Sequence, residues 1–570
     1  MFYTFFFMFV TYIFSLLLFP FYKFYITSRL YIYINTIFLG CLLAINTFLA
    51  YSILVLQTKF LVTFELNNFL NNIVDCSFTV SLTPLSFFFS YLVVIIGFTT
   101  NIYTLNYFKG EADESIFVFW LNAFIASMLT LVLANSFYSL FLGWELIGLT
   151  SFFLINFWQT RRSTLKSSFK AFSFNLVSDI FLLAAFVCFY KTTNTTDCDT
   201  FIYLTLWDNL LINSQTQVGL LFLIICASIK SVQIGGHLWL PDSMEAPVPA
   251  SSLIHSATLV SAGIFLLCKF SCLFIALNWT SFLVLLGSIT AAYGALVSST
   301  QTDLKKLLAY STMSHCGFLW VLASSGNFFI TIFYLFLHGL FKASSFYCAG
   351  SFIRNYGTQD SRLMGSSHIF FRLDTILFLI CSANLGGLPF TFGYFFKSFF
   401  LKFIFLSAIN IVSISFLLIG LLLSLLYFFR LTFYVIFDFY KNYKQLNISA
   451  LQLVTINTSS LLRLTSLPHI LAVSILLFFS VFFIIFFNSY YTDSIILIDS
   501  LDLSGLTFAL INLTVLYKTY YLYFYFAYIL LASTLLLVSY RKSLFNIETT
   551  LALFFFFTFI FFLLKCEVIL

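Results

Sequence analysis

The sequence predicts an all-α polytopic membrane protein with about 16 transmembrane helices. Three observations support this prediction. Apolar residues make up 61% of the chain and Asp, Glu, Lys and Arg only 8%, against about 45–50% and about 25% in soluble proteins. Long apolar runs recur along all 570 residues, and the basic residues between them fall mainly in alternate connections. A chain with so little polar surface has lipid as its solvent.

The spanning segments follow from the rule that a transmembrane helix needs about 20 mainly apolar residues. The first run, 2–19, is longer than a signal-peptide core and has no small-residue cleavage site, so we expect it to be the first span. The candidate spans lie near 2–22, 30–56, 84–108, 115–134, 136–158, 169–190, 217–236, 250–276, 280–299, 303–324, 327–353, 370–401, 403–437, 466–489, 505–538 and 549–565.

The charges of the connections support this count, because Lys and Arg gather on one side of a membrane. The odd-numbered connections carry most of the basic residues: Lys23, Arg29, Arg161, Arg162, Lys166, Arg354, Arg362, Arg372, Lys441, Lys444, Arg463, Arg541 and Lys542. The even-numbered ones lean acidic: Glu65, Asp75, Asp197, Asp199, Asp208, Asp493, Asp499 and Asp502. Two odd-numbered connections, at 111–114 and 242–245, are acidic and break the pattern.

Two of the candidate spans contain elements that interrupt a helix. C-A-S-I-K-S-V-Q-I-G-G-H-L-W-L-P at 226–241 and N-L-G-G-L-P-F-T-F-G-Y-F-F-K-S at 384–398 both carry Gly-Gly and Leu-Pro. Lys230 precedes its Gly-Gly pair and Lys397 follows its own, as expected for two repeats of opposite orientation. The alternative is that Gly and Pro are simply more frequent in membrane helices.

Isolated charges within apolar segments are the strongest functional signal. Glu145 is the only charged residue in 115–160, and Lys397 is the only one in 375–401. Lys230 lies in a similar setting, and each such charge costs at least about 2.5–3.5 kcal/mol on insertion scales. A buried ion pair that sets helix register, or snorkelling near a segment end, would be structural explanations. Function is the other, because intramembrane charges line ion and proton paths.

Three further groups fit a proton path. His338 and Lys342 lie four residues apart on one helix face, and His255 is flanked by hydroxyl residues. An imidazole exchanges protons near neutral pH. Desolvation weakens the hold of a buried lysine on its proton, and a nearby carboxylate strengthens it again. Glu145 and Asp179 are the carboxylates that could modulate a lysine in this way.

No redox cofactor is expected. The 11 cysteines are odd in number and contain neither a C-x-x-C pair nor a histidine at zinc-like spacing, so we predict no disulfide framework and no iron–sulfur cluster. Cys268 and Cys272 share a helix face, where we expect them to be small packing residues. The chain also lacks a dinucleotide fingerprint and a convincing pair of haem ligands. We therefore expect no cofactor in this chain.

Several motifs closely resemble the antiporter-like membrane subunits of respiratory complex I. They are G-W-E-L-I-G-L-T-S-F-F-L-I-N-F-W at 143–158, H-L-W-L-P-D-S-M-E-A-P-V-P-A-S-S-L-I-H-S-A-T at 237–258, T-D-L-K-K-L-L-A-Y-S-T-M-S at 302–314, H-G-L-F-K-A at 338–343 and Q-D-S-R-L-M-G at 359–365. The resemblance covers about residues 80 to 440, and its segment 239–258 is highly specific.

The resemblance implies two inverted five-helix repeats with broken helices and a C-terminal lateral helix along the membrane arm. It divides the chain into N-terminal helices (1–110), a first repeat (111–278), a second repeat (279–440) and C-terminal helices with the lateral helix and a final anchor (441–570). By motif it makes Glu145 and Lys230 the paired groups of the first half-channel, with Asp179 nearby. The linking groups would be His255, His338 and Lys342, and the broken-helix lysine of the second half-channel would be Lys397.

Four positions depart from the family pattern. Ser398 stands where an Asp usually follows the broken-helix lysine, so the proton exit cannot be assigned to that carboxylate. Leu176 replaces an Arg common three residues before Asp179. His315 stands where a Gln is usual, and Tyr334 where a His is often found. The match weakens after residue 442.

The function implied is proton translocation in the mitochondrial inner membrane, as a subunit of NADH:ubiquinone oxidoreductase. Redox chemistry would take place in partner subunits of the membrane protein complex and reach this chain as conformational or electrostatic change. Other membrane-arm subunits and lipids are the expected partners, with no nucleic acid. A cation/proton antiporter subunit is the alternative, and a scaffold whose charges only specify packing is a third.

Overall fold

The structure of the protein is a computed structural model. It describes residues 28–55, 63–65, 79–438 and 471–480. The short gaps within the third range are 110, 112, 208–209, 257, 368–371, 389–390, 392, 395–396, 398–399 and 402–409. The chain divides into two compact units, Met1–Leu501 and Asp502–Leu570, and all the described residues belong to the first.

Some expectations lie outside the described residues. They are the spans near 2–22, 505–538 and 549–565, most of the span near 466–489, the lateral helix and Ser398.

The N-terminal helices follow the predicted spans closely. They are α3 (Ser28–Val55), α4 (Pro84–Tyr107), α5 (Glu114–Leu133) and α6 (Phe137–Ile155). The start of α4 is set by a capping box between Thr83 and Ser86, with Pro84 in the first helical turn. A short antiparallel pair, β1 (Thr63–Glu65) and β2 (Thr79–Ser81), precedes it and is the only sheet among the described residues.

The next helices depart from the prediction in length and number. Helix α7 (Arg162–Thr193) is longer than the expected 169–190 and ends at Asn194, whose φ of 53° is left-handed. Helix α8 (Cys198–Trp207) and the turn η1 (Leu210–Ile212) occupy a stretch that we expected to be a connection. With 10 residues, α8 is too short for the span criterion that the sequence analysis applied.

The first interrupted segment is confirmed, and its break comes earlier than expected. Helix α9 (Ser214–Lys230) ends at its lysine, and two 3₁₀ turns follow, η2 (His237–Trp239) and η3 (Asp242–Glu245). The expected span 250–276 is confirmed as one apolar candidate span, Val248–Ala276, and within it α10 (Val248–Ser256) and α11 (Leu259–Ala276) are separate helices. Thr258 donates its hydroxyl to the Leu253 carbonyl (2.6 Å) at this junction.

The elements after α11 are again mostly long helices, with one break. They are α12 (Thr280–Thr300), α13 (Leu304–Ser324), α14 (Phe328–Tyr356), η4 (Ser361–Leu363), α16 (Arg372–Gly386), α18 (Ile411–Thr432) and the π-turn η5 (Phe433–Phe437). The expected span 370–401 is interrupted after Gly386, where Gly387 has a φ of 74°. A helix at Leu471–Ser480 is the last described element.

The chain is a polytopic membrane protein. Among the described residues, eight helices are long and apolar enough to cross a membrane, and three shorter helices are also apolar. Large apolar side chains cover the outer face of α7, where Phe169 and Ile180 are 60% and 67% exposed. Such a surface suits lipid or another membrane subunit and does not suit water.

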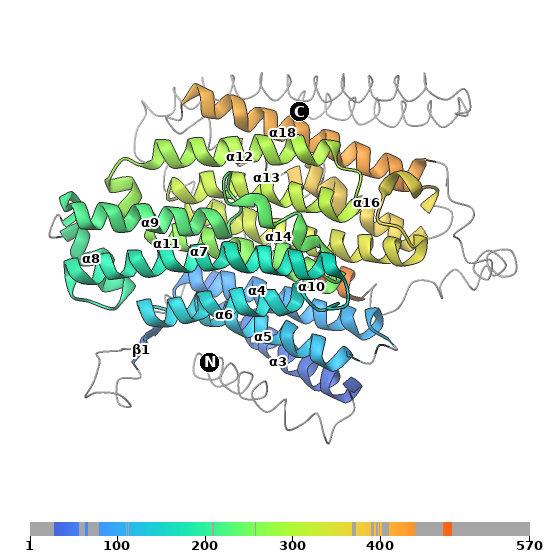
Figure 1. Cartoon of the computed structure of the whole chain (residues 1–570), viewed down its shortest axis with the longest axis horizontal. Coiled ribbons are helices and arrows are strands. Elements are labelled where there is room, and N and C mark those ends of the chain that lie inside the picture. The colour runs from blue at the N-terminus through green and yellow to red at the C-terminus, as the bar shows by residue number, and fades with distance from the viewer. Residues whose placement is uncertain are drawn as a thin grey trace, which may run out of the picture. The chain divides into compact units, whose positions relative to one another are not determined.

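Helices α12, α13 and α18 pack side by side (Figure 1). The contact between α12 and α13 is so close that a Cβ atom on Gly317 would lie 2.6 Å from the Ala291 nitrogen and 2.7 Å from the Gly287 carbonyl oxygen. Small residues that let two backbones approach in this way are the usual means of helix association in lipid. This contact positions α13, which carries His315.

Replacing Gly317 by Ala tests this packing. Ala favours a helix by about 1 kcal/mol over Gly, but here the added methyl group must push α13 away from the α12 backbone. We expect Gly317→Ala to lower the thermal unfolding midpoint of the purified protein in detergent. Gly148→Ala is the matched control, because its Cβ would meet Asn175 at an ordinary 3.5 Å. Equal midpoints for the two variants would contradict the close approach.

Candidate functional site

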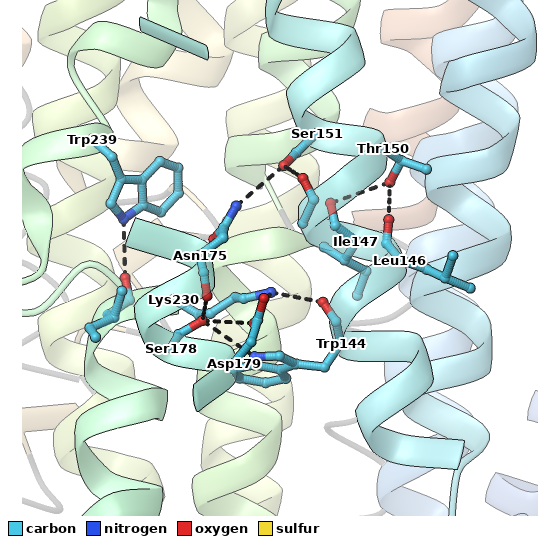
Figure 2. A network of polar contacts seen from close by, with 12 residues as sticks. Trp144, Leu146, Ile147, Thr150, Ser151, Asn175, Ser178, Asp179, Lys230 and Trp239 are labelled. Carbon is cyan, nitrogen blue, oxygen red and sulfur yellow. Dashed lines mark hydrogen bonds and ion pairs between the residues drawn. The ribbon is translucent and has the colours of Figure 1, made fainter. Parts of the chain in front are cut away.

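Lys230 is the best-defined group of the candidate site. It is fully buried at the last residue of α9. Its ammonium group donates a hydrogen bond to the Trp144 carbonyl on α6 (2.9 Å) and lies 4.6 Å from the centre of the Trp144 ring. The Asp179 carboxylate on α7 is 3.9 Å away (Figure 2). Three helices therefore converge on one positive charge.

The Asp179 carboxylate is held by a serine with competing partners. The Ser178 hydroxyl lies 3.1 Å from Asp179 Oδ1 and 2.6 Å from the Asn175 carbonyl, and it accepts a hydrogen bond from the Trp144 indole (3.4 Å). A hydroxyl has one proton to donate, so Ser178 can serve only one of the two oxygens at a time. Figure 2 shows these groups clustered around Lys230. The hydrogen bond from Ser178 to Asp179 can therefore form or break without a helix movement.

Glu145 does not occupy the position that the sequence analysis expected. It follows Trp144 on α6 but is exposed on the outer side of the helix. The carboxylate within 4 Å of Lys230 belongs to Asp179, and the expected ion pair between Glu145 and Lys230 is not formed in this structure. The reason is helical periodicity, because Trp144 and Ile147 turn inward and Glu145 lies between them in sequence.

The break after Lys230 is stabilised by side chains of the following motif. Val232 has a φ of 62°, a left-handed conformation that is unusual for a β-branched residue and often marks a functional site. The Trp239 indole donates to the Ile229 carbonyl (3.1 Å), which the ended helix leaves without its usual partner. The Gln233 side chain accepts from Thr290 on α12 (2.7 Å). The unusual backbone is therefore fixed by the residues around it.

His255 is a further buried group of the candidate site, on the helix that follows the first break. It is fully buried on α10, and its Nε2 is 3.0 Å from the Ser243 hydroxyl. Its Nδ1 has no hydrogen-bond partner among the described atoms. The imidazole ring lies between the rings of Trp239 (6.2 Å) and Phe346 (6.4 Å). Phe346 belongs to α14, one turn beyond Lys342.

Lys342 and His338 share a face of α14, as expected from their spacing. Lys342 is fully buried and donates to the Ser311 hydroxyl and to the Leu308 carbonyl (3.4 Å), both on α13. His338 is 2% exposed, and its Nε2 has no hydrogen-bond partner in the described part of the chain. The His338 ring lies 4.8 Å from that of His315. Lys342 is thus held by neutral groups, without a carboxylate within 4 Å among the described residues.

Lys397 is the last of the predicted site residues along the chain and follows the second helix break. It is 4% exposed and donates to the Gly386 carbonyl at the end of α16 and to the Ser424 hydroxyl on α18, both at 2.7 Å. Neutral oxygens hold it as they hold Lys342. At both breaks a lysine therefore donates to a carbonyl oxygen of the protein interior, Trp144 for Lys230 and Gly386 for Lys397.

Two buried basic side chains at this site were not predicted as site residues from the sequence. His315 was noted only as a departure, yet it contacts His338. Lys305, in the first turn of α13, is 3% exposed and donates to the carbonyls of Met244 (3.4 Å) and Ala246 (3.0 Å). The signal for it was the Lys-Lys pair within the 302–314 motif, whose first lysine is buried and whose second is half-buried.

Helix α7 also holds the loop between α9 and α10. Lys170 pairs with Asp242 at 2.5 Å, and the Ser163 hydroxyl donates to Glu245 (3.2 Å). With Lys305 on the other side, the acidic 242–245 connection is tied to two helices. Among the described residues, no three His, Cys, Asp or Glu side chains are placed to hold a metal ion.

Residues 134–427 match the sequence family described as NADH:quinone oxidoreductase/Mrp antiporter, transmembrane region. NADH-ubiquinone oxidoreductase chain 5 of Paramecium tetraurelia is 42% identical over 370 residues, which cover 64% of this chain and 65% of the relative. The chain 5 protein of Phytophthora infestans is 32% identical over 386 residues, 66% of this chain and 58% of the relative. The matches thus span less than two thirds of these relatives.

Two solved structures show the same fold. The Mrp complex from Dietzia sp. DQ12-45-1b matches with a TM-score of 0.69 at 24% identity, over 83% of this chain and 51% of the matched one. An archaeal respiratory membrane complex, the membrane-bound sulfane sulfur reductase, matches with a TM-score of 0.70 at 18% identity, over 84% and 75%. At these identities the likeness concerns the fold, which is that of antiporter-like membrane subunits.

Gly387 offers a test of the Lys397 position. A Cβ atom at Gly387 would lie 2.5 Å from Lys397 Cδ, and the residue has a φ of 74°. Gly357 has a φ of 70° with nothing within 4 Å, so Gly357→Ala measures the backbone strain alone. We expect Gly387→Ala to lower the thermal unfolding midpoint more than Gly357→Ala does.

The double variant Gly387→Ala/Lys397→Ala isolates the contact. Its loss should be smaller than the sum of the two single losses, because the side chain that the methyl group displaces is gone. Strict additivity would show that Lys397 does not lie against Gly387.

Proposed function

The chain belongs to the NADH:quinone oxidoreductase/Mrp antiporter family of membrane proteins, and from this premise we propose that it is a proton-translocating membrane-arm subunit of respiratory NADH:ubiquinone oxidoreductase. The names of the Paramecium and Phytophthora relatives support the assignment to that complex. The observation that carries the proposal is the burial of four lysines at 0–4% exposure, three of them held by neutral oxygens: Lys230, Lys305, Lys342 and Lys397. Buried basic groups of this kind mark ion and proton paths.

The proposal includes the finer architecture of the family. The chain would have about 16 transmembrane helices, with N-terminal helices at 1–110, inverted repeats at 111–278 and 279–440, and C-terminal helices at 441–570 that include a lateral helix and an anchor. The two breaks support the inverted repeats, because Lys230 ends the helix before its break and Lys397 follows the end of α16. The lateral helix would contact other membrane-arm subunits.

The proton path would begin at Lys230. In the observed arrangement Asp179 is its partner, and Glu145 stays on the outer side of α6. A carboxylate near the ammonium group favours its charged form, and withdrawal of that carboxylate favours release. Approach and withdrawal of a carboxylate, Asp179 as observed here or Glu145, would therefore load and unload a proton at Lys230. The freedom of Ser178 to choose between Asp179 and the Asn175 carbonyl would assist this change.

Released protons would pass His255 and reach His338 and Lys342 on α14. Each histidine presents a buried ring nitrogen without a hydrogen-bond partner among the described atoms, so each can accept a proton without first breaking a bond. Lys397 would receive the proton in the second half. The proton would leave near Lys397, and the sequence assigns no carboxylate to its exit, because Ser398 follows this lysine.

The chain itself would carry no redox centre. Partner subunits would oxidise NADH and reduce the quinone, and their energy would arrive as a conformational or electrostatic change. The location would be the mitochondrial inner membrane, in keeping with the named relatives.

A cation/proton antiporter subunit is the second candidate, favoured by the fold shared with the Mrp complex. Native gel electrophoresis of detergent-solubilised membranes separates the two candidates. Under our proposal this chain co-migrates with NADH dehydrogenase activity. Its recovery alone, or only with other antiporter-like chains, would exclude the respiratory assignment.

Lys230→Ala is expected to reduce proton pumping per NADH oxidised at least several-fold while the complex still assembles, because the variant removes the group that is loaded. Dye quenching in sealed membrane vesicles measures the pumping, and a native gel measures the assembly. Lys306→Ala is the control, since this lysine is 41% exposed and pairs only with Asp303 (3.6 Å) among the described residues. Full pumping by Lys230→Ala would favour the scaffold interpretation, in which the charges only specify packing.

A further inference from the structure

His315 joins two helices that the proposed path otherwise leaves unconnected. It is fully buried on α13, and both of its ring nitrogens face tyrosine hydroxyls. Nδ1 lies 2.8 Å from the hydroxyl of Tyr334 on α14, and Nε2 lies 3.2 Å from the hydroxyl of Tyr427 on α18. The ring also lies 4.8 Å from that of His338, with an interplanar angle of 34°.

The chemistry of this arrangement suits proton transfer. A neutral imidazole donates through one nitrogen and accepts through the other, while a tyrosine hydroxyl can do either. The triad of Tyr334, His315 and Tyr427 can therefore exist with its hydrogen bonds pointing toward α14 or toward α18. Tyr334 lies one turn before His338 on the same face of α14, so one end of the triad is next to the proposed relay.

The other end of the triad leads to Lys397. Ser424, which accepts a hydrogen bond from Lys397 (2.7 Å), lies three residues before Tyr427 on α18. Residues three apart share a helix face, so the two side chains leave α18 about one turn from each other. Polar groups thus follow one another from the His338 ring to His315 and the Tyr427 hydroxyl, and the Ser424 hydroxyl on the same face of α18 contacts Lys397. This series of groups crosses from α14 to α18 by way of α13.

We propose that His315 is a relay residue that carries protons between His338 and Lys397 through the Tyr427 and Ser424 face of α18. This inference rests on the proposed function and specifies the step between the two halves of the path. Its contacts come from three helices, and the close packing of α12 with α13 holds it in place.

His315 takes up one proton for each proton that it gives away. Nδ1 takes the hydroxyl proton of Tyr334, which regains one from the His338 side, and the ring becomes a cation with two N–H groups. Nε2 then gives its proton to Tyr427, whose own hydroxyl proton moves on toward Ser424 and Lys397. One proton enters and one leaves, and the ring ends as the other neutral tautomer. Return to the starting tautomer requires a proton to leave Nδ1 and another to be taken up at Nε2, because rotation of the ring does not exchange the two nitrogens.

The test uses the assembled respiratory complex in sealed membrane vesicles, with NADH oxidation and proton pumping measured in parallel. We expect His315→Gln and Tyr427→Phe to lower the protons pumped per NADH at least two-fold, with assembly on a native gel unchanged. Tyr91→Phe is the matched control, because it removes a buried hydroxyl that has no hydrogen-bond partner among the described residues. If His315→Gln fails to assemble, Tyr427→Phe decides the question.

The exchange variant His315→Tyr/Tyr334→His distinguishes relay from packing. It keeps an imidazole and a phenol in contact, and under our proposal it restores at least half of the pumping that His315→Gln loses. Normal pumping by both single variants, or an assembled exchange variant that does not recover, would overturn the role of His315. Lys342→Ala separates this outcome from the larger one, because normal pumping in that variant would instead refute the proposed function.

Discussion

The constraint on which this structure depends is the cost of holding ammonium groups away from water. A buried cation is tolerated only when protein oxygens replace its hydration shell. Lys230 has a carbonyl, an aromatic ring and a carboxylate around it. Lys342 and Lys397 have only carbonyl and hydroxyl oxygens among the described residues. The first site therefore has a negative charge beside its ammonium group, which the described surroundings of the other two lack.

One helix break supplies such an oxygen, and at both breaks a side chain of the protein bonds a carbonyl near the helix end. A helix that ends within the membrane leaves carbonyl groups without partners. At α16 the Gly386 carbonyl accepts from Lys397, and at α9 the Ile229 carbonyl accepts from Trp239. At the second break the lysine and the ended helix therefore depend on each other, because Lys397 bonds a carbonyl that the helix end provides. At the first break the freed carbonyl is bonded by Trp239, and Lys230 bonds a carbonyl of α6.

Helix α14 connects the parts of the site. Its face carries Phe346 against His255, Lys342 against α13, and His338 against His315. Positions separated by four residues present these groups one above another. A change in the charge of one is therefore felt by its neighbours, because they share a dry interior in which electrostatic interactions are weakly screened. On this face, among the described residues, the His338 ring contacts one imidazole of another helix, that of His315 on α13.

Features that depend on neighbouring residues in the chain could be predicted from the sequence. The length that a membrane requires of a helix predicted α3 to α6, α12 and α13 within a few residues. Isolated charges pointed to Lys230 and Lys397, because a charged residue among apolar neighbours can be recognised from the order of residues alone. Features that depend on distances between helices could not be predicted from the sequence. Both Glu145 and Asp179 were candidate partners of Lys230, and which of them lies beside it depends on which face of α6 turns inward. The contacts of His315 with Tyr334 and Tyr427 join residues 19 and 112 positions apart, and only the packing of α13 against α14 and α18 brings them together.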